Sequence, residues 1–494
     1  MSDVTPAAPG GHAAHESARS GSLVPGRIGF GGYRIDDQTP EHRQALELAL
    51  ASGCRLIDTS TNYTDGGSER LIGAVLHELT GRGAIRREEI AVVTKIGYVQ
   101  GANLEVALER ERAGRPFPEM VRYMEGCWHC IHPDFLRDQL TRSQERLRLE
   151  TVDVCLLHNP EYFLSDAAKH RRGGLEEARS EFDRRLREAF AFLEESVKAG
   201  RLRGYGVSSN TAVSAPGDPE ATSVVRMLAA AEAAGGSRHH FRILQVPMNL
   251  FESGAALTRN TGPGNGQTAL QAAAAAGLEV LLNRPLNAFV EGRLLRLAEP
   301  RVLPPEMPIA ESVSILERLE KEYRSEVGAP EADHKDADLL FEMVGQVAGL
   351  ADQIEDFLHW QQVEQQYIIP RMNTLVGALG RGVPAGRRDR FGAWWDRYLP
   401  ALRRLLQDVG RTAASKGREQ AVSIASAIDP ALPRDLRGES LSRKALHVLT
   451  STPGVGAVLV GMRRAEYVRD ALGIAGWPPL ADPIAILRHF ADPG

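Results

Sequence analysis

Residues 55–81 read RLIDTSTNYTDGGSERLIGAVLHELTG, and this stretch holds the pattern that decides the fold. Residues 55–60 form a short apolar run that ends in polar side chains, as expected for a parallel strand buried on both faces. Residues 68–81 have the spacing of an amphipathic helix, with Ser68 as its candidate N-cap. The stretch therefore predicts one strand, a polar loop and one helix.

The same strand–helix unit recurs along the chain. We expect strands over residues 27–33, 55–60, 90–97, 152–159, 203–209, 241–249, 278–286 and 456–461. We expect helices over residues 40–53, 68–81, 132–149, 180–201, 222–235, 266–277, 440–451 and 464–475. Eight such units in one order predict an α/β fold of the (β/α)₈ TIM-barrel class. A doubly wound open sheet is the alternative, but GFGGYR (29–34) does not match the glycine fingerprint that a dinucleotide-binding sheet needs after its first strand.

The loops that follow the strands are much longer than those that precede them. The longest insertions cover residues 98–131 and 287–439, each after the carboxyl end of a strand, where barrels keep their active sites. Apolar residues recur at helical spacing in the second insertion. We therefore expect a mostly helical insertion subdomain at the carboxyl-terminal, catalytic face of the barrel. The predicted domains are a disordered tail (1–22), a barrel (23–289 and 440–494) and a helical insertion (290–439).

Composition narrows the class of protein. The 494 residues carry a formal net charge of −5, with 59 basic and 64 acidic residues intermixed, so we expect neither nucleic acid nor a membrane surface as a partner. The four cysteines are too few for a disulfide framework, and the amino-terminal residues lack the features of a signal peptide. We therefore expect a cytoplasmic protein. Nothing in the sequence indicates its oligomeric state.

Polar residues gather at the ends of three consecutive predicted strands. Asp58 and Tyr63 follow the second strand, Lys95 lies near the end of the third, and His158 ends the fourth. A tyrosine ordinarily ionises near pH 10, and a nearby ammonium favours its phenolate. Asp58 is suited to hold Lys95 in place, and His158 is suited to hydrogen-bond a carbonyl oxygen beside the Tyr63 hydroxyl.

These residues predict an oxidoreductase that interconverts an aldehyde or ketone and its alcohol. Tyr63 is the expected catalytic acid and base, and Asp58, Lys95 and His158 are the other expected catalytic residues. No side chain supplies hydride, so a reduced nicotinamide cofactor is implied. The long loops make a sugar derivative one candidate for the small-molecule substrate.

Several motifs resemble the aldo/keto reductase superfamily. They are IDTSTNY followed by GGSERLIG, VVTKIG, LRDQLTRSQERLRLETVDVCLLHNP, RLRGYGVSSN, ILQVPMN and ALHVLTSTPGVGAVLVGMRRAEYV. The resemblance covers residues 26–289 and 440–475 and leaves the large insertion outside. It places the superfamily's Asp, Tyr, Lys and His on Asp58, Tyr63, Lys95 and His158.

The resemblance also implies where a nicotinamide cofactor binds. The implied contacts are Gly31, Tyr33, Ser208, Ser209, Asn210, Gln245, Asn283, Arg284, Pro285, Leu286, Gly461, Met462, Arg463 and Arg464. In the seventh strand the superfamily usually has an aromatic residue and a serine where this chain has Asn283 and Arg284. Arg284 is a candidate for binding the cofactor pyrophosphate, and a structural ion pair with a barrel carboxylate is the alternative. Arg463 and Arg464 favour NADP(H) over NAD(H) because they suit a 2′-phosphate.

Other functions stay open at this point. A redox-sensing or regulatory protein that holds the cofactor with little turnover fits the missing aromatic and the helical insertion. A sugar-modifying enzyme without net redox change is a further alternative. Cys127 and Cys130 form one Cys-x-x-Cys pair, but a zinc site usually needs two such pairs, so we expect no metal.

Overall fold

The computed structural model describes residues 23–170, 174–327, 335–354, 357–383 and 385–491. The predicted disordered tail, residues 1–22, lies outside the described residues. The chain divides into two compact units, one formed by Met1–Ala288 with Ser442–Gly494 and the other by Phe289–Leu441.

The first unit is built on a closed barrel of parallel strands, as the sequence predicts. Its strands, in their order around the barrel, are β1 (Ile28–Gly31), β15 (Val455–Val460), β12 (Glu279–Asn283), β9 (Phe241–Pro247), β8 (Leu202–Ser208), β7 (Val152–His158), β3 (Ala91–Ile96) and β2 (Leu56–Asp58). β1 pairs with both β15 and β2, which closes the ring and excludes the alternative of an open doubly wound sheet.

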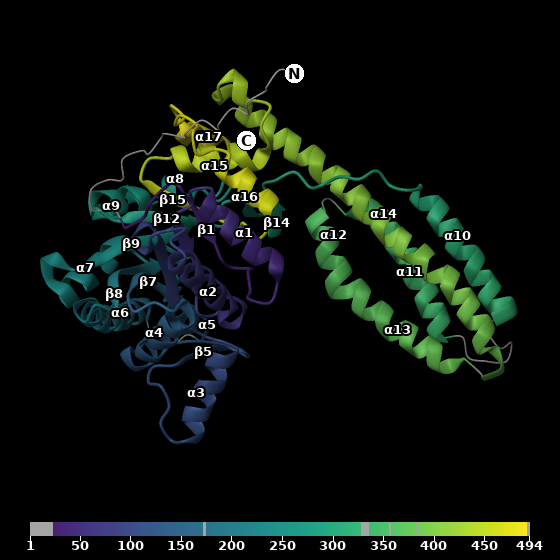
Figure 1. Cartoon of the computed structure of the whole chain (residues 1–494), viewed down its shortest axis with the longest axis horizontal. Helices are drawn as coiled ribbons and strands as arrows, with labels where there is room; N and C mark the ends of the chain where they lie inside the picture. The colour runs from purple at the N-terminus through teal and green to yellow at the C-terminus, as the bar shows by residue number, and fades with distance from the viewer. Residues whose placement is uncertain (1–22, 171–173, 328–334, 355–356, 384, 492–494) are drawn as a thin grey trace, which may run out of the picture. The chain divides into compact units, whose positions relative to one another are not determined.

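Helices surround the strands of this unit (Figure 1). They are α1 (Pro40–Ala51), α2 (Gly67–Gly81), α4 (Pro133–Leu147), α6 (Leu175–Lys198), α7 (Val224–Gly235), α9 (Ala269–Ala275), α15 (Leu441–Ser451), α16 (Ala465–Leu472) and α17 (Pro483–Ala491).

Several helix starts differ from the prediction. The helix α6 begins at Leu175, five residues before the predicted start at residue 180. Ser68 is not the N-cap of α2, because Gly66, with a φ of 78°, occupies that position and the Ser68 hydroxyl bonds the Thr59 hydroxyl at 2.7 Å. The helix expected over 266–277 begins at Ala269, because a capping box between Thr268 and Gln271 fixes its start. The two residues before it form the short strand β11 (Gln267–Thr268), which pairs with β10 (Arg259–Thr261).

Side chains along the barrel strands alternate in direction, so every second residue belongs to one face. Leu56, Val93, Leu156, Ile243 and Leu281 belong to one buried apolar cluster. Two residues further along the same strands stand Asp58, Lys95, His158, Gln245 and Asn283. The register pairs His158 with Ser208 and Ser208 with Gln245, which sets these residues at one level. The barrel interior thus ends in a polar layer at its carboxyl end.

Short elements follow the carboxyl ends of β3, β7 and β9. The first insertion holds β4 (Tyr98–Val99), α3 (Ala102–Arg112), β5 (Val121–Met124) and β6 (Cys127–His129), with the strands joined in the order β4-β6-β5. After β7 comes α5 (Tyr162–His170), which packs against β5, and after β9 comes α8 (Gly254–Leu257). Cys127 therefore begins the strand β6, and Cys130 follows its last residue.

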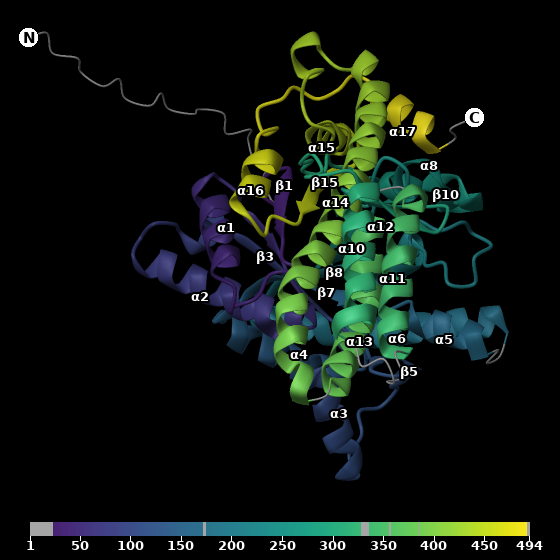
Figure 2. The same cartoon turned by 90° about the vertical axis from the view of Figure 1, so that its right-hand side faces the viewer.

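The second unit is mostly helical, and the chain enters it through β13 (Asn287–Val290) and β14 (Arg293–Arg296). Its helices are α10 (Ile309–Glu322), α11 (Lys335–Gln353), α12 (Phe357–Val363), α13 (Ile369–Gly382) and α14 (Arg388–Ile428). Figures 1 and 2 show α10, α11 and α12 lying alongside the long helix α14. Trp360, Trp394 and Tyr398 are buried in the hydrophobic core of this unit. The apolar residues at helical spacing in the insertion therefore form a core of their own.

Within the described part of the chain, every helix is too short or too polar to cross a membrane.

Candidate active site

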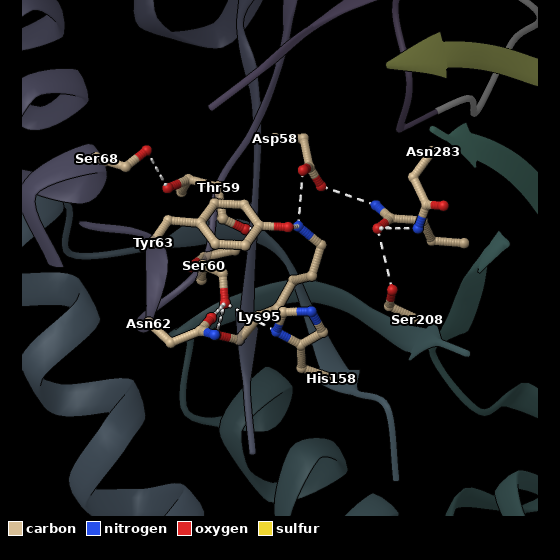
Figure 3. Close-up of polar contacts among 12 residues, drawn as sticks. Asp58, Thr59, Ser60, Asn62, Tyr63, Ser68, Lys95, His158, Ser208 and Asn283 are labelled. Atoms are coloured by element: carbon tan, nitrogen blue, oxygen red, sulfur yellow. Dashed lines mark hydrogen bonds and ion pairs between the residues drawn. The ribbon is translucent and has the colours of Figure 1, made fainter. Parts of the chain in front are cut away.

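Lys95 stands at the centre of the polar layer and is fully buried. Its Nζ donates hydrogen bonds to Asp58 Oδ2 at 2.7 Å, to the Thr59 carbonyl oxygen at 2.9 Å and to the Tyr63 hydroxyl oxygen at 3.0 Å. These contacts use all three donors of an ammonium group. Burial disfavours its charge, but the negative charge of Asp58 and the bond to Tyr63 outweigh burial and raise the pKa of Lys95. Lys95 is therefore an ammonium ion held by Asp58 and aimed at the Tyr63 hydroxyl (Figure 3).

Tyr63 reaches this position through a tight turn after β2. It begins a short 3₁₀ turn, Tyr63–Gly66, in which Thr64 and Asp65 have φ values of 48° and 52°. Left-handed conformations of this kind are unfavourable for residues other than glycine and need support. Thr64 Oγ1 donates to the Ile35 carbonyl at 2.6 Å, and Asp65 Oδ1 accepts from the Ala102 amide at 3.1 Å. Contacts on both sides thus hold the turn that carries Tyr63.

The electrostatic balance at Tyr63 differs from the simple expectation of a lowered pKa. Burial is the largest influence and raises the pKa of Tyr63, while the Lys95 ammonium lowers it and the Asp58 charge adds to the rise. The net shift of the Tyr63 pKa is upward. Without Lys95, burial would raise the pKa of Tyr63 further. Tyr63 is therefore a neutral phenol that can donate a proton.

His158 ends β7 beside this group. Its Nδ1 lies 3.0 Å from Ser60 Oγ, and its ring packs edge-on against Tyr63 with a centroid distance of 5.9 Å. Burial and then the charge of Lys95 lower the pKa of His158 well below its usual range, so the imidazole is neutral at neutral pH. The His158 carbonyl accepts a hydrogen bond from His129 Nε2 at 2.7 Å, which ties the strand end to the β4–β6 insertion.

A hydrogen-bonded group of amide and hydroxyl side chains lies on the other side of Asp58. Gln245 Nε2 donates to Asp58 Oδ1 at 2.8 Å, and Gln245 Oε1 accepts from Ser208 Oγ at 3.0 Å and from Asn283 Nδ2 at 3.3 Å. Among the described residues no group donates to the buried Asn283 Oδ1. Hydroxyl and amide groups of this kind suit the carboxamide of a nicotinamide, which has both donors and an acceptor. The residues present therefore fit such a cofactor.

Two further predicted contacts, Ser209 and Asn210, are engaged elsewhere. Ser209 Oγ lies 2.9 Å from Thr222 Oγ1 and accepts from the Thr211 and Ala212 amides, so it stabilises its own loop. The Asn210 backbone amide donates to Glu161 Oε1 at 2.6 Å, and the Asn210 side chain is exposed. The structure does not join these two side chains to the group around Lys95.

Arg284, which follows β12, forms an ion pair with a carboxylate of the barrel unit. Arg284 has a φ of 53° and donates from Nη2 to Glu252 Oε1 at 3.2 Å. The structure thus contains the ion pair that was the alternative to a pyrophosphate contact. The next two residues, Pro285 and Leu286, are buried and half-buried respectively.

The remaining predicted residues follow β1 and β15, which are neighbours in the barrel. Gly31 pairs with Asp58 in register, and a Cβ at this position would lie 3.2 Å from the Val460 carbonyl oxygen. Tyr33 is 62% exposed, and its ring packs edge-on against Tyr63 at a centroid distance of 5.1 Å.

After β15 the chain runs through an exposed Gly461 and a buried Met462 to two arginines. Arg463 forms no ion pair with any described residue, whereas Arg464 is the N-cap residue of α16 and lies 3.8 Å from Glu466. The structure therefore leaves a guanidinium available beside the amino-terminal end of a helix.

A sequence profile described as "Aldo/keto reductase family" matches residues 27–216, the part of the chain that contains Asp58, Tyr63, Lys95, His158 and Ser208. This part of the chain is similar to the aldo/keto reductase family. The profile ends before Gln245, Asn283 and the helical unit.

Known aldo/keto reductases and dehydrogenases resemble part of the chain. An NAD(P)H-dependent D-xylose reductase from Scheffersomyces stipitis is 25% identical over 37% of this chain and 48% of its own length. A D-threo-aldose 1-dehydrogenase from a Pseudomonas species is 27% identical over 42% of this chain and 54% of its own length. The chain thus spans about half the length of these relatives.

Solved aldo-keto reductase structures align with most of the chain at low similarity. The holo form of an enzyme from Bacillus halodurans has a TM-score of 0.45 at 15% identity, over 95% of this chain and 93% of that one. An enzyme from Klebsiella pneumoniae in complex with NADPH has a TM-score of 0.43 at 15% identity, over 95% and 92% of the two chains.

Some polar residues near the candidate site were missed by sequence reasoning. Glu161 is 3% exposed, burial raises its pKa to about 7, and among the described residues its Oε2 has no hydrogen-bond partner. Ser60 and His129 contact His158 directly. Ser60 lies within the first motif, and Glu161 follows His158 by three residues, so the sequence offered a signal for both. His129 comes from an insertion whose position no sequence pattern predicted.

Proposed function

We propose that the protein interconverts a small aldehyde or ketone and its alcohol by hydride transfer, with NAD(P)(H) as the cofactor. The observation that carries the proposal is the position of Lys95 Nζ, which contacts Asp58 on one side and the Tyr63 hydroxyl on the other. Such a triad is suited to acid–base chemistry at a carbonyl group. It prepares a phenol to give a proton to a carbonyl oxygen and to take it back from an alcohol.

In the direction of reduction, Tyr63 Oη donates its proton to the carbonyl oxygen as negative charge develops there. The Lys95 ammonium, fixed 3.0 Å away, stabilises the phenolate that remains. Asp58 keeps the ammonium charged and in place, since the pair is buried together. The nicotinamide, when bound, supplies or accepts the hydride.

The chain offers groups for both ends of that cofactor. Ser208, Gln245 and Asn283 would hold its carboxamide beside Asp58. Arg463 and Arg464 would bind a 2′-phosphate, so NADP(H) is the preferred form. The other proposed contacts remain Gly31, Tyr33, Ser209, Asn210, Gly461, Met462 and residues 283–286.

The test is a coupled measurement of cofactor and product. NADPH or NADH should be consumed in a one-to-one ratio with the alcohol formed from short aldehydes, such as glyceraldehyde and methylglyoxal. Product formation without a change in cofactor absorbance would contradict the proposal.

A regulatory protein that binds the cofactor and turns it over slowly is the second candidate. Its support is the end of β12, where Asn283 and the next residue, Arg284, stand in place of the aromatic residue and serine that the superfamily resemblance leads us to expect. Arg284 is paired with Glu252. Tight NADPH binding with no consumption across the aldehydes would favour this function over catalysis.

A further inference from the structure

Glu161 is a buried carboxyl group that the proposed mechanism does not use. It follows His158 by three residues, just after the chain leaves β7. Its Oε1 accepts a hydrogen bond from the Asn210 backbone amide at 2.6 Å, and among the described residues its Oε2 has no hydrogen-bond partner. The groups that favour its charged form are backbone amides and the Ser209 hydroxyl, and none of these is a cation. An ionised Glu161 is therefore a buried negative charge that no positive charge neutralises.

Glu161 and the proposed carboxamide site belong to neighbouring strands. In the parallel pair of β7 and β8, His158 is the register partner of Ser208. Ser208 Oγ donates to Gln245 Oε1 at 3.0 Å, in the hydrogen-bonded group that would hold the carboxamide. Asn210, whose amide Glu161 binds, follows Ser208 by two residues. Glu161 is thus bonded to the same short segment that presents the Ser208 hydroxyl to the cofactor.

The charges of the polar layer cancel one another. Asp58 Oδ2 and Lys95 Nζ form an ion pair at 2.7 Å, so the carboxylate and the ammonium together carry no net charge. Tyr63 is a phenol because burial raises its pKa, and His158 is a neutral imidazole because burial and Lys95 lower its pKa. An ionised Glu161 therefore adds one negative charge that the polar layer does not balance.

We propose that Glu161, when ionised, stabilises the oxidised form of the bound nicotinamide relative to the reduced form. The oxidised ring carries one positive charge and the reduced ring carries none, so a nearby carboxylate attracts only the oxidised form. Buried charges interact through a low effective dielectric and are screened little by salt. Because NADP⁺ is the product when hydride is donated, Glu161 favours reduction of the carbonyl. The inference rests on the proposed function, since it requires the nicotinamide to bind beside Ser208.

The effect of Glu161 should depend on pH. Burial raises the pKa of Glu161 to about 7, so the group is charged at pH 8.5 and mostly protonated at pH 6. The titratable groups that face it are the phenols of Tyr98 on β4 and Tyr162 on α5. Burial raises the pKa of both tyrosines, so neither changes charge in this range. The segment after β8 faces Glu161 with uncharged amide and hydroxyl groups.

The measurement is the Kd of the full chain for NADP⁺ and for NADPH, by isothermal titration calorimetry at both pH values. Glu161→Gln removes the charge but keeps an oxygen that can accept from the Asn210 amide. At pH 8.5 we expect the ratio of the Kd for NADP⁺ to the Kd for NADPH to be about three- to tenfold higher in Glu161→Gln than in the unaltered protein. At pH 6 the ratios of the two proteins should agree within about twofold.

Glu194→Gln is the matched control. Glu194 is also a buried carboxyl group of the barrel unit, but it bonds the Tyr205 hydroxyl and the His240 amide, near the amino end of β9. It should leave the ratio unchanged. A purely structural role of Glu161 would change both Kd values together, and an unchanged ratio at pH 8.5 in Glu161→Gln would overturn the proposal. An equal rise in Glu194→Gln would overturn it as well.

A failure of the proposed function would look different. If the unaltered protein bound neither NADP⁺ nor NADPH, the proposed function would be contradicted, and the role of Glu161 with it. If both forms bound and only the ratio failed to respond to Glu161→Gln, the proposed function would stand and the role of Glu161 would be wrong.

Discussion

The Nζ atom of Lys95 lies 3.0 Å from the hydroxyl oxygen of Tyr63. Lys95 reaches that position from the strand β3, and Tyr63 from the turn after β2. The ammonium is also bound to a buried carboxylate, so it cannot lose its charge without leaving that carboxylate unpaired. Because burial alone raises the pKa of Tyr63, this contact is what keeps the phenolate accessible as a transient form.

Replacing Lys95 with methionine should separate the effect of the Lys95 charge on the pKa of Tyr63 from the effect of burial. The methionine side chain preserves much of the volume but removes the positive charge, so the pKa of Tyr63 should rise further. We expect kcat to fall by roughly 10²- to 10⁴-fold, and alcohol oxidation to require a higher pH than in the unaltered protein. The pH dependence of kcat/KM checks this, with thermal unfolding of each variant as the control for folding. A fall in activity with an unshifted pH profile would contradict the role of the charge.

Glu161 should make stability depend on pH. Burial raises its folded-state pKa from the ordinary 4.5 to about 7, so the folded chain binds more protons than the unfolded chain between these pH values. The free energy of unfolding should therefore decrease as pH rises from about 4.5 to about 7, by up to about 3 kcal/mol from this group.

Glu161→Gln should remove that part of the dependence and be more stable than the unaltered protein at pH 8. Urea unfolding at pH 5 and pH 8 measures both proteins under the same conditions. Identical pH dependence in the two proteins would show that Glu161 titrates normally. The predicted change lies in stability, so it can be read without any substrate.

The two arginines after β15 should decide between the cofactors. Arg463→Ala with Arg464→Ala should raise the Kd for NADPH by at least about tenfold, since a guanidinium–phosphate contact contributes roughly 1.5 to 3 kcal/mol. The Kd for NADH should change little. Arg469→Ala, on the exposed side of α16, is the matched control. Equal effects of the double variant on NADPH and NADH would argue against a 2′-phosphate site.

The barrel and its polar layer were accessible from the sequence for a physical reason. Strands buried on both faces must be apolar, so Asp58, Lys95 and His158 stood out at strand ends, and parallel strands bring such ends together. Lys95 and Asp58 were predicted as a pair for this reason and form one.

The failures have physical reasons as well. The cap at Ser68 was misjudged because Gly66 could take the left-handed conformation that the turn required. The net direction of the Tyr63 pKa depends on burial, which a motif does not reveal. The contacts of His129 and Gln100 depend on how an insertion folds back beside the barrel, and no spacing in the sequence specified that. The predicted domain boundaries and the catalytic roles of individual residues remain predictions.

The central claim, that Tyr63 is the catalytic acid and base, is tested most directly by Tyr63→Phe. The substitution removes one oxygen atom and leaves the ring packed against Tyr33 and His158. NADPH affinity, measured by fluorescence titration, and aldehyde reduction, measured by NADPH consumption, should be compared with those of the unaltered protein. The account predicts a Kd for NADPH within about twofold and a turnover lower by at least about 10³-fold. Turnover close to that of the unaltered protein would contradict it.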